Sequence, residues 1–129
     1  MCKEAVEIET RHIALRIAEL AREKKAQRVV VLDMSRVVNF CDYFVIASGT
    51  SLRQVNALAE AIEEELAKRD IHPSSEVYPQ DQSGWIALDF GQVIVHLFHK
   101  PLREFYALEE LWSDAKRIRI PRKGAVKPR

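Results

Sequence analysis

The sequence predicts an α+β fold in a single domain, an α/β sandwich in which helices pack on a mixed β-sheet. Two observations support this class. Long segments with apolar residues three or four positions apart alternate with short runs rich in β-branched residues. Their order is helix, strand, strand, helix, an antiparallel strand pair and a helix, without a repeat. The 129 residues, 47% of them apolar, are enough for one hydrophobic core.

The first helix is expected between Glu4 and Lys25. Charged residues surround an apolar stripe at helical spacing, formed by Ile13, Ile17, Leu20 and Ala21. Two short apolar runs follow, Val29–Leu32 and Tyr43–Ala47, which are typical of largely buried strands.

The second helix is expected to begin after Ser51, because Ser51 and Gln54 have the spacing of a capping box. Its buried stripe comprises Val55, Leu58, Ala59, Ile62 and Leu66. The segment Asp70–Gly84 contains two prolines and predicts a loop with one short edge strand at Glu76–Tyr78.

A hairpin is predicted next, with strands at Trp85–Phe90 and Gln92–Phe98 joined at Gly91, where a positive φ angle is accessible. The aliphatic positions of the second strand are expected in the core: Val93, Val95 and Leu97. Pro101 fits the first turn of a last helix. The apolar stripe of that helix comprises Leu102, Phe105, Leu108, Leu111 and Trp112.

The triplet Asp89-Phe90-Gly91 also occurs in protein kinases, where its aspartate binds Mg²⁺. A kinase is a much longer chain with a Gly-rich loop, a strand lysine and an H-R-D loop, none of which is present. We therefore interpret the triplet as the bend of the hairpin.

The turn Ser48–Ser51 lies between a strand and a helix, where backbone N–H groups can hold a phosphate. Nucleotidyltransferases use a similar turn together with paired carboxylates that hold metal ions. Residues i and i+2 of a strand share a face, but Asp33, Asp42 and Asp89 each lack a second acid at that spacing. Helix capping explains the same turn residues through the amides alone.

The histidine and serine residues form no recognisable catalytic motif in the sequence. His96 and His99 would point to opposite faces of a strand, and no third ligand lies nearby in the sequence. No nucleophile elbow G-x-S-x-G occurs. We expect neither a metal site nor a cofactor.

One face of the hairpin mixes aromatic and polar side chains: Trp85, Asp89, Ile94, His96 and Phe98. This composition is typical of a protein–protein contact. Coverage of the face by the last helix is the alternative, and both can hold at different ends of the face.

The C-terminal residues are basic, although the net charge of the chain is only +1. After Asp114 the chain has seven Lys or Arg residues and no acid. This predicts a basic, flexible tail at residues 119–129 that follows a folded domain at residues 1–118. The tail either keeps the chain soluble or contacts RNA.

The two cysteines, Cys2 and Cys41, indicate no disulfide framework, so a reducing cytoplasm is expected. No apolar run has the length of a membrane span, and the N-terminus is unlike a signal peptide.

Three longer blocks carry a family resemblance. They are Asp42–Ser51 with Arg53–Val55 behind it, Gly84–Gly91 leading into Val93–Phe98, and Arg103–Trp112. In this order they resemble the signature of the ribosomal silencing factor (Iojap-like) family, over about residues 8–118.

The resemblance implies a non-enzymatic translational repressor. Members of that family bind the large ribosomal subunit through its ribosomal protein number fourteen. They block joining of the small subunit sterically and lower translation in nutrient limitation. Their fold is similar to that of nucleotidyltransferases but lacks the catalytic carboxylates, and they tend to form homodimers.

We therefore expect a cytoplasmic ribosome-binding protein with no membrane partner and no small-molecule substrate. The expected ribosomal-protein-binding surface comprises Trp85, Asp89, Ile94, His96, Arg103 and Tyr106. In it, Trp85 is an apolar anchor, His96 is a hydrogen-bonding aromatic, and the two charged residues set orientation. The basic tail adds weak contact with ribosomal RNA. The alternatives are a degenerate nucleotidyltransferase-like nucleotide-binding protein that uses Ser48–Ser51 and a dimeric scaffold.

Overall fold

The computed structural model describes residues 3–74, 84–101 and 114–120. Within these ranges the chain forms α1 (Lys3–Glu23), β1 (Gln27–Asp33), β2 (Tyr43–Gly49), α2 (Leu52–Ala67), β3 (Trp85–Asp89), β4 (Val93–His99) and β5 (Lys116–Ile118). Lys100 and Pro101 are helical, but the rest of the predicted last helix and the predicted edge strand Glu76–Tyr78 lie outside the described residues. The predicted α+β class is confirmed.

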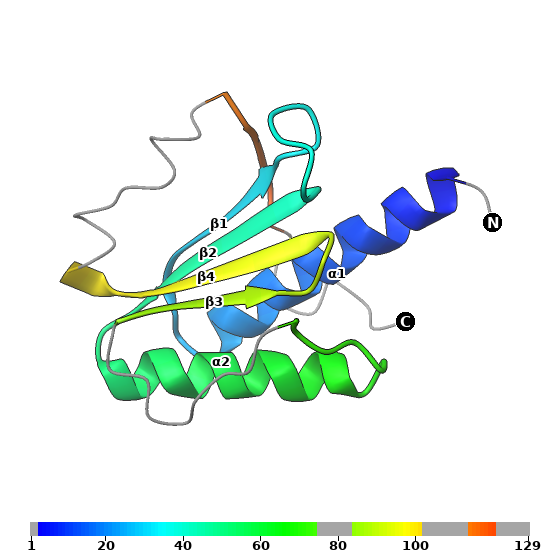
Figure 1. Cartoon of the computed structure of the whole chain (residues 1–129). Helices are drawn as coiled ribbons and strands as arrows, with labels where there is room; N and C mark the ends of the chain where they lie inside the picture. The colour runs from blue at the N-terminus through cyan, green and yellow to red at the C-terminus, as the bar shows by residue number, and fades with distance from the viewer. Residues whose placement is uncertain (1–2, 75–83, 102–113, 121–129) are drawn as a thin grey trace.

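The five strands form one mixed sheet in the order β3-β4-β2-β1-β5 (Figure 1). β2 and β4 are the parallel pair, with Phe44 opposite Ile94 and Gly49 opposite His99. The other neighbouring strands are antiparallel. Gly91, with a φ of 91°, lies in the turn that sends β3 back along β4, as the hairpin prediction requires.

Both α1 and α2 lie on the same side of the sheet (Figure 1). The larger hydrophobic cluster combines their apolar stripes with the strand residues that face them, such as Ile17 of α1, Leu58 of α2 and Val45 of β2. The predicted core positions of β4 are confirmed as buried: Val93, Val95 and Leu97. Since a fully buried aliphatic side chain contributes about 1.5–3 kcal/mol, this face is the main source of stability.

An ion-pair cluster joins the two helices. Arg16 of α1 contacts Glu65 of α2 through Nη2 at 2.9 Å and Glu19 of its own helix through Nη1 at 2.9 Å. Because these three side chains are largely buried, the pairs hold α1 and α2 in one relative position. None of the helices in the described ranges has the length and hydrophobicity needed to cross a bilayer.

Lys116–Ile118 forms β5 at the edge of the sheet next to β1, a strand that was not predicted from the sequence. Ile118 and Ile120 are buried in the main core, whereas Arg117 and Arg119 are exposed. This alternation is typical of a strand with one buried side and one solvent-exposed side. It escaped prediction because the arginines and lysines dominate the composition of the segment.

Gly49 allows the close approach of β2 and α2. A Cβ atom at this position would lie 2.9 Å from Val55 Cγ2 and 3.1 Å from the Val55 backbone nitrogen. The second atom belongs to the backbone and has little freedom to move, so only glycine fits without a shift of the helix.

Gly49→Ala should therefore lower the free energy of unfolding by about 1–3 kcal/mol, the usual cost of overpacking. Urea denaturation measures this. Val55→Ala removes the nearest colliding atom, so the double variant should lose less stability than the sum of the two single variants. Additive losses would contradict the collision.

Candidate functional site

The strand-to-helix turn and the nearest strand aspartate lie at opposite ends of the sheet. Gly49 ends β2, while Asp89 pairs with Ile94, which pairs with Phe44 at the start of β2. Five residues of strand separate the two positions, or about 16 Å along the strand. Asp33, opposite Tyr43, lies at the same end as Asp89. A phosphate held at the turn would not meet either carboxylate.

The Thr50 backbone amide of the turn and the Gln54 amide of the first helical turn both have side-chain acceptors. Ser51 accepts the N–H of Gln54 at 3.1 Å, as the predicted capping box requires. The Gln54 side chain, however, accepts the N–H of Thr50 at 2.7 Å rather than that of Ser51. Its amide nitrogen donates to the carbonyls of Lys24 and Lys25, at 3.2 Å each. Gln54 therefore ties the start of α2 to the end of α1 and occupies an N–H that a phosphate would need.

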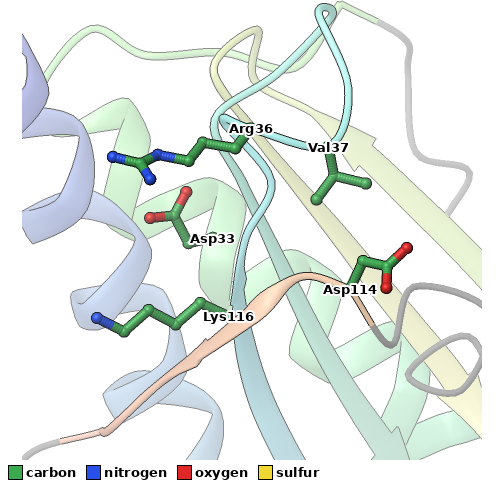
Figure 2. Close-up of a pocket in the computed structure, with 5 residues that line it drawn as sticks. All are labelled: Asp33, Arg36, Val37, Asp114 and Lys116. Atoms are coloured by element: carbon green, nitrogen blue, oxygen red, sulfur yellow. The ribbon is translucent and has the colours of Figure 1, made fainter.

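A cavity of about 290 Å³ lies where β1 ends and β5 begins. Figure 2 shows Asp33 between Arg36 and Lys116, with the Asp114 carboxylate turned away from them. Asp33 also accepts from the N–H and hydroxyl of Ser35, at 3.0 and 2.6 Å. The two carboxylates do not converge: the Arg36 and Lys116 side chains lie on either side of Asp33, and Asp114 points away from it. In residues 3–74, 84–101 and 114–120 no three His, Cys, Asp or Glu side chains gather as metal ligands.

The buried thiol of Cys41 is also unsuited to chemistry. Burial, together with the nearby carboxylates of Asp42 and Asp89, raises its pKa to about 11. The nucleophilic form of cysteine is the thiolate, so Cys41 stays an unreactive thiol near neutral pH.

An aromatic patch lies on the sheet face opposite to α1 and α2. We define it as Phe40, Phe44, Trp85, His96 and Phe98. The Trp85 ring stacks on Phe98 with a centroid distance of 5.1 Å. Phe44 meets the edge of His96 at 4.7 Å, and Phe40 lies 6.4 Å from Phe44. The two large apolar side chains that are exposed within the described residues both belong to this patch, Phe40 at 57% and Trp85 at 37%.

His96 is held in one protonation state by its surroundings. The Trp85 indole N–H donates to His96 Nδ1 at 3.3 Å. Burial lowers the pKa of His96 to about 4, so the ring is neutral at neutral pH. A neutral ring that accepts at Nδ1 carries its hydrogen on Nε2. This Nε2–H is buried and has no hydrogen-bond partner in the described part of the chain.

The structure brings together four of the six expected site residues. Trp85, Asp89, Ile94 and His96 share one face of the β3–β4 hairpin, because their registers match across the strands. Trp85 and His96 are in direct contact at one end. Asp89 and Ile94 are cross-strand neighbours at the other end, and both are half-buried. The two remaining expected residues, Arg103 and Tyr106, lie outside the described residues.

Phe40 was not among the expected site residues. It belongs to the loop between β1 and β2, and its contact with Phe44 extends the patch beyond the hairpin. The sequence holds a weak signal for it, an apolar side chain between Asn39 and Cys41 in a loop, where nothing local demands one.

The lowered pKa of His96 predicts a pH-dependent stability. Between about 4 and 6.5 the unfolded chain binds a proton at His96 that the folded chain does not. The free energy of unfolding should therefore fall as the pH falls through this window, by about 1.4 kcal/mol per pKa unit. His96→Gln should flatten the curve from denaturant titrations over this range.

The matched control is His72→Gln, since the His72 side chain is 63% exposed. This variant should keep the wild-type pH dependence. Equal curves for wild type and His96→Gln would show that His96 is not the group responsible.

Comparison with known proteins places the chain in a family. The sequence model described as "Ribosomal silencing factor during starvation" matches residues 7–129. The Ribosomal silencing factor RsfS of Bacillus subtilis is 38% identical over 102 residues, which are 78% of this chain and 86% of that protein. The mouse protein named Mitochondrial assembly of ribosomal large subunit protein 1 is 31% identical over 75% of this chain, and the match spans 43% of the mouse protein.

A solved structure has the same fold as this chain. A crystal structure of a protein from Bacillus halodurans superposes with a TM-score of 0.67 and 30% identity, covering 92% of this chain and 99% of that one. The fold is thus shared over nearly the whole length. The family match covers the aromatic patch as well as the helix-covered core, and the resemblance of the three sequence blocks is confirmed. The chain belongs to the family of ribosomal silencing factors.

Proposed function

We propose that this protein is a translational repressor that binds the large ribosomal subunit and prevents the small subunit from joining. The expected docking partner is ribosomal protein number fourteen of the large subunit. Binding takes place in the cytoplasm and lowers translation when nutrients are limiting. The printed name of the mouse relative, which refers to the ribosomal large subunit, supports this choice of subunit.

The observation that carries the proposal is the exposed part of the aromatic patch. It lies on the sheet face opposite to α1 and α2 (Figure 1). It contains both of the large apolar side chains that are exposed among the described residues. Exposed aromatic side chains are enriched among the residues that dominate protein–protein binding energy. This argues for a docking surface on the hairpin and the loop that carries Phe40.

Trp85 is already fixed in the free protein. Its ring stacks on Phe98, and its N–H donates to His96. A side chain that is ordered before binding loses little conformational entropy on binding, which raises affinity. Asp89 and Ile94 extend the surface to the far end of the hairpin.

We infer that the protein acts without catalysis. Asp33 and Asp89 lie at the opposite end of the sheet from the Gly49 turn, and the carboxylates of Asp33 and Asp114 point apart, which supports this inference. The alternative of a nucleotide-binding protein that uses Ser48–Ser51 is weakened by Gln54, which occupies the N–H of Thr50. The homodimer implied by the family stays a prediction.

Trp85→Ala should weaken binding to isolated large subunits by about 2 kcal/mol or more, roughly thirtyfold, because a central aromatic anchor is lost. Co-sedimentation with large subunits measures this. The fold should survive, since Trp85 lies on an edge strand and is partly exposed, and circular dichroism checks it.

Leu52→Ala is the matched control, because Leu52 is a half-buried apolar residue in the first turn of α2, on the other side of the sheet. It should bind like the wild type. Undiminished binding by Trp85→Ala would remove the patch from the proposed interface.

The basic residues that follow Ile120 are proposed to add weak contact with ribosomal RNA. Since Ile120 is buried in the core, a clean test deletes residues 121–129 rather than 119–129. The truncated protein should bind large subunits with a shallower dependence on salt, because fewer phosphates are neutralised. Parallel plots of log affinity against log salt for both proteins would argue against any role of the tail.

A further inference from the structure

The edge of the sheet opposite to β3 carries a second candidate surface. A groove of about 310 Å³ lies between the last turn of α1, the first half of β1 and the segment from Arg117 to Ile120. Three arginines line it: Arg22, Arg117 and Arg119. All three are exposed. The apolar side of the groove includes Val29, Val30 and Ile118.

The charges of this groove are not compensated nearby. None of the described residues that line it carries a carboxylate. Within residues 3–74, 84–101 and 114–120, none of the three arginines has an ion pair. This differs from the cavity in Figure 2, where Asp33 and Asp114 balance Arg36 and Lys116. One groove therefore gathers three unbalanced positive charges on a chain whose net charge is only +1.

The backbone fixes two of these charges in place. Arg117 belongs to β5 and is paired with Leu32 of β1. Exposed and buried residues alternate from Arg117 to Ile120, and the two isoleucines anchor this segment in the core. Arg117 and Arg119 are thus presented side by side from a fixed backbone, whereas a disordered tail would have to order itself on binding.

We propose that this groove binds the phosphate backbone of RNA. Arginine donates two parallel hydrogen bonds to a phosphate, and neutralising several phosphates releases counterions, which favours a dense polyanion. The valine and isoleucine side chains suit the less polar sugar edge. The described lining residues include no aromatic side chain for base stacking, so binding is expected to be independent of sequence.

The proposal deepens the proposed function by giving ribosomal RNA a defined contact, and it rests on that function only for the source of the RNA. The groove lies at the β5 edge and the aromatic patch reaches the β3 edge, so the two surfaces are separable by mutation. The sequence continues after Ile120 with four further basic residues: Arg122, Lys123, Lys127 and Arg129.

The experiment uses the full chain and a short labelled RNA duplex, followed by fluorescence anisotropy at several salt concentrations. The triple variant R22Q/R117Q/R119Q should bind at least tenfold more weakly at low salt. The slope of log affinity against log salt should become less steep by about 2–3, roughly one unit per lost phosphate contact.

The matched control is R11Q/R36Q/R53Q, which removes the same charge from three exposed arginines outside the groove. It should keep nearly the wild-type slope. Equal losses in the two triple variants would reduce the effect to net charge and overturn the groove. Poly-glutamate that binds as tightly as the RNA, with the same dependence on the three arginines, would overturn it in favour of an acidic protein segment.

Trp85→Ala separates this proposal from the proposed function. It should leave binding to the RNA duplex unchanged, because Trp85 does not line the groove. If the groove variant binds RNA normally while Trp85→Ala still releases the protein from large subunits, the groove proposal fails alone. If Trp85→Ala keeps subunit binding while the groove variant loses the RNA, the patch fails and the groove stands.

Discussion

The parallel pairing of β2 with β4 determines where the candidate functional groups of this protein lie. Both strands finish at the same end of the sheet, where Gly49 and His99 are opposite each other. β3 runs antiparallel to β4, so Asp89 at the end of β3 lies at the opposite end of the sheet. The phosphate-binding potential of the Gly49 turn and the acids of the sheet are thereby kept apart.

The alternation of side chains along β4 divides the sheet into two faces with different roles. Val93, Val95 and Leu97 pack under the helices and supply most of the hydrophobic stabilisation. His96 and Phe98 point to the other face, where His96 is neutral, buried and has one unpartnered N–H among the described residues. A buried donor without an acceptor costs stability. The hydrogen bond from the Trp85 N–H to His96 Nδ1 offsets part of this cost.

Local periodicity was sufficient to predict most elements, because the apolar spacing of α1, α2, β2 and the β3–β4 hairpin is set by residues near in the sequence. It also predicted that Trp85 and His96 share a face, since strand side chains alternate. Pairing between distant segments was not predictable in this way. The Gln54 side chain bonds to Thr50 and to the Lys24 carbonyl after α1, thirty residues away, instead of to the N–H of Ser51.

The two candidate surfaces, the aromatic patch and the arginine groove, also depend on contacts that local periodicity does not predict. The hydrogen bond between Trp85 and His96 depends on the hairpin register, and the exposure of Phe40 depends on how its loop packs, so neither follows from composition. β5 escaped prediction because two isoleucines supply the only apolar signal in a basic run. The groove with Arg22 follows only once β5 is placed beside β1, which brings together residues nearly a hundred positions apart.

The central claim is that the sheet face opposite to the helices meets the large ribosomal subunit. Hydrogen–deuterium exchange of the protein, free and bound to isolated large subunits, tests it most directly. The account predicts slower exchange on binding in β3 and in the loop that carries Phe40, with little change along the exposed side of α2. Slower exchange along α2 together with unchanged exchange in β3 would contradict it.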